Sequence, residues 1–181
     1  MPRKTKYDPV EAWVIPDQVL KPKLSDYLEV MSKAVFQAGL SWAAIARNWD
    51  AYIAAYDKFE PKVVALYGDA DVERLMETDG VLHSRKKITA TINNARAILE
   101  LDAQYKGFAK YLRSFESYEA LAKDFRKRFK FMGEMNVWYF LFRVNEPVPK
   151  FEQWITTIEG DHPRMKDMVE RGRAAGTSTE Y

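Results

Sequence analysis

The sequence Phe129-Lys130-Phe131-Met132-Gly133-Glu134 joins two segments of opposite character. The segment that leads into it, residues 125–130, is basic and amphipathic, whereas residues 135–142 are apolar on nearly all sides. The apolar segment is rich in aromatic residues and could form a strand. Helical patterns surround it, however, and we interpret it as a buried helix. The stretch therefore predicts a helix, a tight hairpin that contains glycine, and a second helix.

A hairpin of this kind can direct backbone N–H groups toward one phosphate of DNA, helped by the N-terminus of the second helix. The neighbouring Lys130 and Arg128 add attraction that does not depend on base sequence. The alternative is an ordinary helix–helix turn beside a solvated run of charge. The more typical DNA-binding hairpin carries two glycines, and here Phe131 stands where the first would be.

Helical patterns extend outward from the hairpin. Apolar residues from Leu24 onward recur with the helical period, Gly39 ends or bends this helix, and Ser41 is a good N-cap for the next one. Further helices are expected after Asn48, over residues 61–67, from Asp71, over residues 108–115, from Ser117 and after Pro163. Ser84 caps a long helix whose apolar stripe consists of Ile88, Ile92, Ala95 and Leu99.

No strand-and-turn pattern is convincing, so we predict an all-α fold. We expect an irregular N-terminal arm over residues 1–23 that packs on the domain, because four prolines interrupt it. A helical domain should occupy residues 24–175, and residues 176–181 should form a frayed tail.

Composition bounds the class of protein. The 181 residues carry a formal net charge of +2, which is too balanced to indicate a nucleic-acid binder by itself. The chain has no cysteine and only two histidines, so we expect no disulfide and no metal. No apolar run approaches the roughly 20 residues of a membrane span, and no secretory signal is evident. We therefore expect a soluble cytoplasmic protein, associated with the nucleoid and without a membrane partner.

A second motif, Gln37-Ala38-Gly39-Leu40-Ser41-Trp42, predicts an unusual corner between two helices. The Trp42 ring offers a flat face on which a base can stack, and Leu40 could wedge into the gap that a flipped nucleotide leaves. The alternative is that both side chains are core residues packed around the corner.

The third motif is the loop from Gly80 that enters the long helix with three consecutive basic residues, Arg85, Lys86 and Lys87. These residues could contact phosphate. The motif is equally well explained as the start of a capped surface helix.

Together, in this order and spacing, the three motifs resemble the DNA-3-methyladenine glycosylase I family of the helix-hairpin-helix superfamily. The resemblance runs over residues 24–145 and includes Val144-Asn145 after the second hairpin helix. It implies a monofunctional enzyme without a cofactor. Such an enzyme flips an alkylated purine such as 3-methyladenine out of double-stranded DNA and cleaves its N-glycosidic bond. We expect it to act as a monomer.

The resemblance also assigns roles to residues. The base pocket would consist of Ala34, Gln37, Ser41 and Trp42, and Leu40 would plug the duplex. The DNA backbone would be bound by Arg85, Lys87, Arg128, Lys130, Phe131, Met132 and Gly133. Because alkylation makes the base cationic and a good leaving group, an aromatic pocket and a carboxylate can suffice for catalysis.

The chain departs from the family at the pocket carboxylate. The family has a glutamate three residues before the glutamine of the second motif, where this chain has Ala34. Glu29 is a poor substitute because five residues place it about 140° away around the helix. Glu146 is the candidate catalytic carboxylate, and Asp161 is a weaker one.

The termini depart as well. The zinc site that many family members carry near their termini needs cysteines that this chain lacks. Trp13 or Tyr7 could still line the pocket from the N-terminal arm. The leading interpretation is a glycosylase for alkylated purines, and the alternative is a non-catalytic helix-hairpin-helix module that binds damaged or alkylated DNA.

Overall fold

The computed structural model describes residues 18–40 and 42–158, and of Trp42 and Ala43 it describes the backbone alone. Within this part of the chain every regular element is a helix, so the all-α prediction is confirmed. The elements are α1 (Leu24–Gln37), α2 (Trp42–Arg47), α3 (Trp49–Ala55), η1 (Asp57–Phe59), α4 (Pro61–Val64), α5 (Asp69–Glu77), α6 (Arg85–Tyr105), α7 (Phe108–Leu112), α8 (Tyr118–Arg128), α9 (Glu134–Arg143), α10 (Phe151–Trp154) and η2 (Ile155–Thr157).

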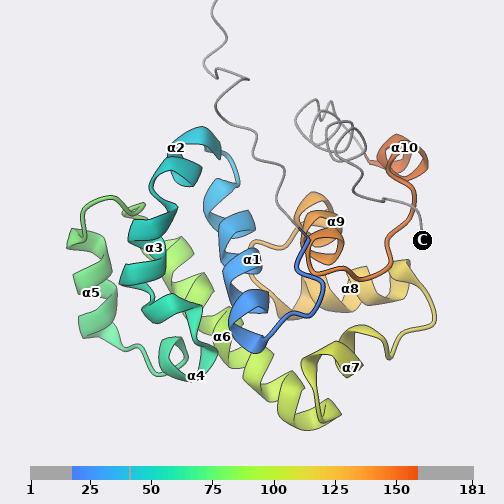
Figure 1. Ribbon diagram of the computed structural model, residues 1–181, viewed down its shortest axis with the longest axis horizontal. Coiled ribbons are helices and arrows are strands. Elements are labelled where there is room, and N and C mark those ends of the chain that lie inside the picture. The colour runs from blue at the N-terminus through green and yellow to red at the C-terminus, as the bar shows by residue number, and fades with distance from the viewer. Residues whose placement is uncertain (1–17, 41, 159–181) are drawn as a thin grey trace, which may run out of the picture.

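Helices α1 and α6 lie at the centre of the arrangement (Figure 1). Helix α6 packs against α1, α4, α5 and α7, and α1 also packs against α9. Helices α2 to α5 lie on one side of α1, and α7 to α10 lie on the other (Figure 1). The two central helices therefore position both the hairpin between α8 and α9 and the corner between α1 and α2.

Helix α1 forms where the apolar period predicted it. Its first turn is capped by Asp26, whose carboxylate accepts a hydrogen bond from the Lys23 backbone N–H at 2.7 Å. Its core face is fully buried at Leu28, Met31 and Val35. Burying each such side chain stabilises the fold by roughly 1.5–3 kcal/mol.

Helix α6 begins at the expected cap, because the Ser84 hydroxyl accepts a hydrogen bond from the Lys87 backbone N–H at 3.4 Å. It ends where Lys106 adopts a left-handed conformation and the Gly107 N–H donates to the Asp102 carbonyl at 2.8 Å. The predicted stripe is buried except at Leu99, which is half-buried.

Several predicted boundaries are wrong by a few residues. Helix α5 begins at Asp69, and the Asp71 carboxylate instead caps it by accepting from the Gly68 N–H at 3.1 Å. Helix α4 ends at Val64 rather than at residue 67, because the N–H groups of Leu66 and Tyr67 bond to carbonyls three residues back instead of four. Arg96 of α6 binds carbonyls that follow the helix, at 2.9 Å for Ala65 and 3.2 Å for Tyr67. The expected helix over residues 108–115 stops at 112, and α10 was not expected at all.

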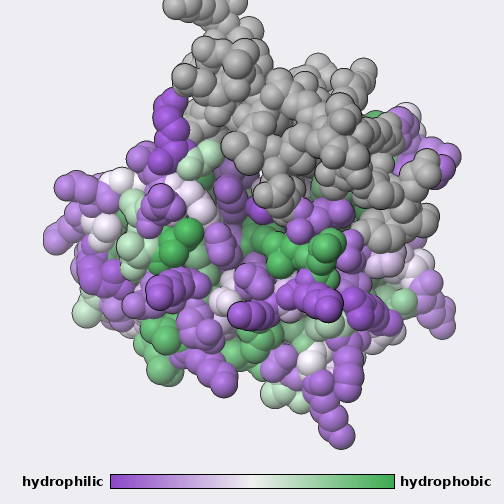
Figure 2. Space-filling view, in the orientation of Figure 1, coloured by the Kyte–Doolittle hydropathy of each residue, from purple (hydrophilic) through white to green (hydrophobic). Residues whose placement is uncertain are grey.

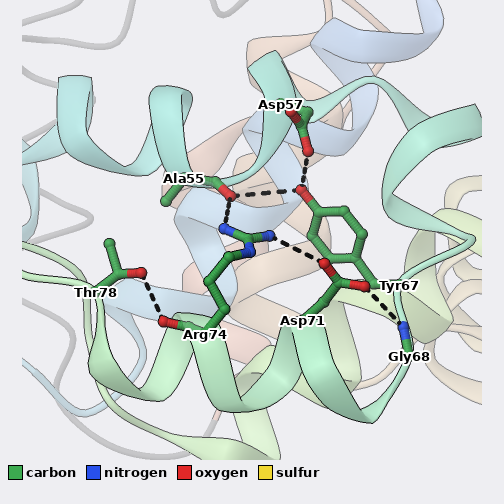
Figure 3. Close-up of polar contacts among 7 residues, drawn as sticks. All are labelled: Ala55, Asp57, Tyr67, Gly68, Asp71, Arg74 and Thr78. Atoms are coloured by element: carbon green, nitrogen blue, oxygen red, sulfur yellow. Dashed lines mark hydrogen bonds and ion pairs between the residues drawn. The ribbon is translucent and has the colours of Figure 1, made fainter.

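A left-handed turn follows α3. Asp57, Lys58 and Phe59 have φ values of +49°, +56° and +54°, a conformation that costs L-residues roughly 1–2 kcal/mol each. The Tyr67 hydroxyl donates to the Asp57 carboxylate, and the Arg74 guanidinium donates to the Ala55 carbonyl at 3.0 Å (Figure 3). These contacts fasten the turn to α5 and the residues before it.

Hydrophilic and hydrophobic side chains are interspersed on the face drawn in Figure 2, and the hydrophobic ones form small separate groups. Among the described helices, none is both long and apolar enough to span a membrane. The helix predicted after Pro163, the frayed tail and most of the N-terminal arm lie outside the described residues. Of the arm, the Val19 N–H donates to the Arg143 carbonyl of α9 at 2.8 Å.

Candidate functional site

The predicted hairpin connects α8 to α9. Phe129 and Met132 are buried, so the hairpin is anchored in the core on either side of its tip. Phe131 has a φ of +56° and is 44% exposed. The position where a more typical hairpin has its first glycine is thus left-handed in this chain, although it carries an aromatic side chain. The Asn136 side-chain amide supports it by donating to the Phe131 carbonyl at 2.8 Å.

The hairpin presents backbone donors at one point. The N–H groups of Phe131, Met132, Gly133 and Glu134 have no hydrogen-bond acceptor within the described part of the chain. Gly133 is the N-cap of α9, whose N-terminus carries the positive end of the helix dipole. Four unpartnered donors beside a helix N-terminus form an arrangement that suits an anion.

The corner after α1 turns at Gly39, whose φ of +73° is accessible to glycine without strain. The Leu40 N–H donates to the Gln37 carbonyl at 3.2 Å, and the Leu40 side chain is half-buried against the core. Ser41 and the Trp42 side chain lie outside the described residues. Leu40 is therefore next to the expected pocket, but part of its surface is covered by the protein itself.

Ala34 and Gln37 share the C-terminal half of α1. Both are buried, and Gln37 is only 4% exposed. The Gln37 Oε1 has no hydrogen-bond partner among the described groups. A buried acceptor without a partner costs roughly 1–3 kcal/mol. A ligand that donated a hydrogen bond to this oxygen would recover that energy.

Lys87, which the resemblance assigns to the DNA backbone, makes intramolecular contacts. Its ammonium does not lie free on the surface but donates to the Ala38 carbonyl at 2.6 Å and to the Phe36 carbonyl at 3.4 Å. Partial burial lowers its pKa. Lys87 thus binds the C-terminal carbonyls of α1, where a cation is favoured by the helix dipole.

The remaining predicted cations differ in whether an acidic side chain already pairs with them. Arg85 forms an ion pair with Glu73 at 2.6 Å, and Arg128 forms one with Asp124 at 2.6 Å. The Lys130 side chain is exposed. An open groove of about 580 Å³ lies between the start of α6 and the hairpin, and its lining includes Arg85, Lys86, Thr89, Asn93, Lys130 and Phe131.

Asn94 is a site residue that sequence reasoning missed. It is 1% exposed, and its side-chain amide makes a reciprocal pair with the Lys130 backbone. The Lys130 N–H donates to Asn94 Oδ1 at 2.8 Å, and Asn94 Nδ2 donates to the Lys130 carbonyl at 3.2 Å. The signal that could have found it is its place in residues 85–96, a segment that carries the family resemblance.

Glu146 is not brought together with the pocket. Its buried carboxylate is bound by Arg113, with Nη2 to Oε1 at 2.8 Å and Nε to both oxygens at 3.1 Å. Burial, and then the Glu146 charge, raise the pKa of Tyr27 to about 12. Tyr27 precedes Ala34 by seven residues, which is about 10 Å along α1. Glu146 therefore serves an ion pair near the other end of α1.

Three further candidates from the sequence are not placed. Trp13, Tyr7 and Asp161 all lie outside the described residues. Glu29, the poor substitute carboxylate, accepts a hydrogen bond from the Trp49 indole at 2.8 Å. Neither Glu29 nor Glu146 is thus a free carboxylate beside Ala34.

Known proteins share this architecture. The chain is similar to a solved 3-methyladenine DNA glycosylase I from Staphylococcus aureus, with a TM-score of 0.64 and 28% identity over 77% of this chain and 86% of that one. It is also similar to a crystal structure of a 3-methyladenine DNA glycosylase I in complex with 3-methyladenine, with a TM-score of 0.61 and 29% identity over 69% and 78% of the two chains.

Curated relatives agree with these structures. DNA-3-methyladenine glycosylase 1 of Escherichia coli (strain K12) is 34% identical over 54% of this chain and 63% of its own length. DNA-3-methyladenine glycosylase of Haemophilus influenzae is 30% identical over 49% of this chain and 48% of its own length. The chain thus spans less than two thirds of either relative.

The family model described as methyladenine glycosylase matches residues 11–136. This range includes the corner after α1, the start of α6 and the hairpin, and it ends before Glu146. Because the match covers more than half of the sequence, the chain belongs to the methyladenine glycosylase family.

Proposed function

We propose that this protein is a DNA glycosylase that hydrolyses the N-glycosidic bond of an alkylated purine, such as 3-methyladenine, in double-stranded DNA. The observation that carries the proposal is the group of unpartnered N–H donors at residues 131–134, on a chain of the methyladenine glycosylase family. Further proposals are that it acts as a monomer and that its substrate is the DNA of the cytoplasmic nucleoid.

Phosphate binding is assigned to the hairpin. Donors from Phe131 to Glu134 would bind one phosphate, and the Lys130 and Lys86 ammonium groups beside the groove would add long-range attraction. Arg85 and Arg128 would have to exchange their ion pairs with Glu73 and Asp124 for contacts with DNA. The Met132 side chain is buried and anchors the hairpin in the core, so only its backbone N–H would contact the phosphate.

Base recognition is assigned to the corner. Trp42 would stack on the extruded base, Ser41 would help to shape the pocket, and Leu40 would fill the space left in the duplex. The unpartnered Gln37 Oε1 would accept a hydrogen bond from an N–H of the base. The buried Ala34 stands where the family has a carboxylate.

The chemistry would rely mainly on the leaving group. Water attacks C1′ of the deoxyribose and loses a proton to the solvent, and the bond to the base nitrogen breaks with both electrons passing to the cationic base, which leaves neutral. Stacking of the cationic base on an aromatic ring would bind and select the extruded nucleotide. The missing carboxylate would cost on the order of 10²–10⁴ in rate, which a labile alkylated base tolerates.

A second candidate function is favoured by one observation, the alanine at position 34. A helix-hairpin-helix module that binds damaged DNA without excising the base would need no pocket carboxylate. The two functions make different predictions for a single assay.

The test incubates the purified protein with methylated duplex DNA and identifies released bases by chromatography. Release of an alkylated purine, reduced about 5- to 100-fold in Trp42→Ala because one stacking contact is lost, would support the glycosylase. Leu66→Ala removes an exposed apolar side chain after α4 and serves as the matched control. Duplex binding without release would favour the binding module, and activity gained by Ala34→Glu would then identify what is missing.

A further inference from the structure

Two polar side chains on one face of α6 hold the two halves of the proposed DNA site. Lys87 binds the end of α1 at the corner, and Asn94 binds the hairpin. The two residues are seven positions apart, which is two turns and about 10 Å along the helix, with nearly the same direction around it. One rigid element thus contacts both the corner and the hairpin.

The Lys87 contact acts on the corner. The last carbonyls of a helix lack intrahelical donors, and the Lys87 ammonium supplies them at Ala38 and Phe36. Ala38 immediately precedes Gly39, the residue at which the backbone reverses. The contact therefore fixes where Leu40 and the start of α2 lie relative to α6.

The Asn94 contact acts on the hairpin. Its amide pairs with both backbone groups of Lys130, as a neighbouring strand would. The pairing occupies the Lys130 N–H, whereas the N–H groups of the next four residues have no acceptor within the described part of the chain. A second amide connects the hairpin to α1 directly, because Asn136 Nδ2 lies 2.8 Å from the Phe131 carbonyl and 3.5 Å from the Ala34 carbonyl.

We propose that Lys87 and Asn94 are positioning residues, and that α6 acts as a spacer that sets the offset between the bound phosphate and the extruded nucleotide. The proposal rests on the proposed function. The proposal separates two steps. Binding of phosphate by the hairpin needs only the Asn94 contact. Extrusion and excision of a base also need the corner to be held in position relative to α6 by Lys87. Loss of the Asn94 contact should therefore impair DNA binding, and loss of the Lys87 contact should impair extrusion and excision.

The test uses the full chain with Lys87→Met, Lys87→Arg and Asn94→Leu, and with Lys110→Met at an exposed position of α7 as the matched control. A duplex that carries the alkylated base next to 2-aminopurine reports extrusion by fluorescence. Single-turnover release of the base reports excision, and binding of an undamaged duplex reports the hairpin. Circular dichroism confirms that each variant is folded at the assay temperature.

Loss of the charged hydrogen bond in Lys87→Met should lower extrusion and the single-turnover rate about 10-fold or more. Its Kd for undamaged duplex should stay within about two-fold, and Lys87→Arg should recover part of the rate. Asn94→Leu should instead weaken binding of undamaged duplex about 10-fold.

Equal losses of binding and excision in both variants, or an unchanged rate in Lys87→Met, would overturn the proposal while wild type still excises. If the wild-type protein releases no base, the proposed glycosylase function is contradicted instead. In that case the extrusion signal still decides whether Lys87 and Asn94 position the site.

Discussion

Arg113 and Glu146 form an asymmetric ion pair in which the carboxylate is buried and the guanidinium is largely exposed. Glu146 has 3% of its side-chain surface exposed and Arg113 has 66%. The carboxylate is held in place by the left-handed Asn145, because the Glu146 N–H donates back to the Leu141 carbonyl of α9 at 2.9 Å. The pair therefore fastens the end of α9 to the end of α7.

Removing either partner of this pair should have unequal effects on stability. Arg113→Met leaves a buried charge without compensation, and we expect it to lower the free energy of unfolding by about 2–4 kcal/mol. Glu146→Gln leaves a neutral amide oxygen that still accepts from Arg113, so its loss should be about 1–2 kcal/mol. Urea denaturation measures both. A larger loss for Glu146→Gln would show that stability depends more on compensating the Arg113 charge than on compensating the buried carboxylate.

The local elements of this fold follow from short-range patterns in the sequence. Ser84 and Ser117 cap α6 and α8 as predicted, each accepting a hydrogen bond from the backbone three residues later. The apolar residues 135–142 form a buried helix rather than a strand. Caps and apolar periods act within a few residues, and a single sequence therefore carries enough information to predict them.

The contacts that assemble the site could not be predicted in the same way. Lys87 binds carbonyls 49 and 51 positions away, and Asn94 binds a residue 36 positions away. Such partners depend on how whole helices pack. For the same reason the sequence does not reveal that Lys87, expected at the DNA backbone, binds carbonyls of α1, or that Glu146, the candidate carboxylate after Val144-Asn145, is held by Arg113.

Phe131 offers a test of backbone strain in the hairpin. Its φ of +56° disfavours any residue with a Cβ, and glycine relieves this cost. We expect Phe131→Gly to be more stable than Phe131→Ala by about 1 kcal/mol, since both lose the same aromatic contacts. The comparison is made by urea denaturation. Equal stability of the two variants would mean that the hairpin relaxes away from the left-handed conformation once the ring is gone.

Lys33 should make stability depend on pH. It lies 5.1 Å from the centroid of the Trp49 ring, and burial first, with Arg143 second, lowers its pKa to about 8. The unfolded chain holds this proton up to the ordinary pKa of 10.5. Between about pH 8 and 10.5 the unfolded state therefore binds more protons, and stability from this group rises with pH.

The measurable quantity is the difference between wild type and Lys33→Met. Below pH 8 both states of wild type are protonated and the burial cost is fully present, so the difference should be flat. From pH 8 to 10.5 the free energy of unfolding of wild type should rise relative to that of Lys33→Met, by up to about 3 kcal/mol. Subtraction of the two curves cancels the ionisation of buried tyrosines. A difference that stays flat across this window would contradict the lowered pKa.

Binding of undamaged duplex as a function of salt should distinguish free from paired cations at the hairpin. A lysine that neutralises one phosphate contributes about 0.9 to the slope of log Kd against log salt. Lys130→Ala should lower that slope by about 1. Arg128→Ala should lower it by clearly less, because its guanidinium is held by Asp124 at 2.6 Å and breaking that pair offsets the gain from phosphate. Isothermal titration at four or more salt concentrations supplies the slopes. An equal decrease for the two variants would show that Arg128 leaves Asp124 when DNA binds, and that all of the cations around the hairpin act alike.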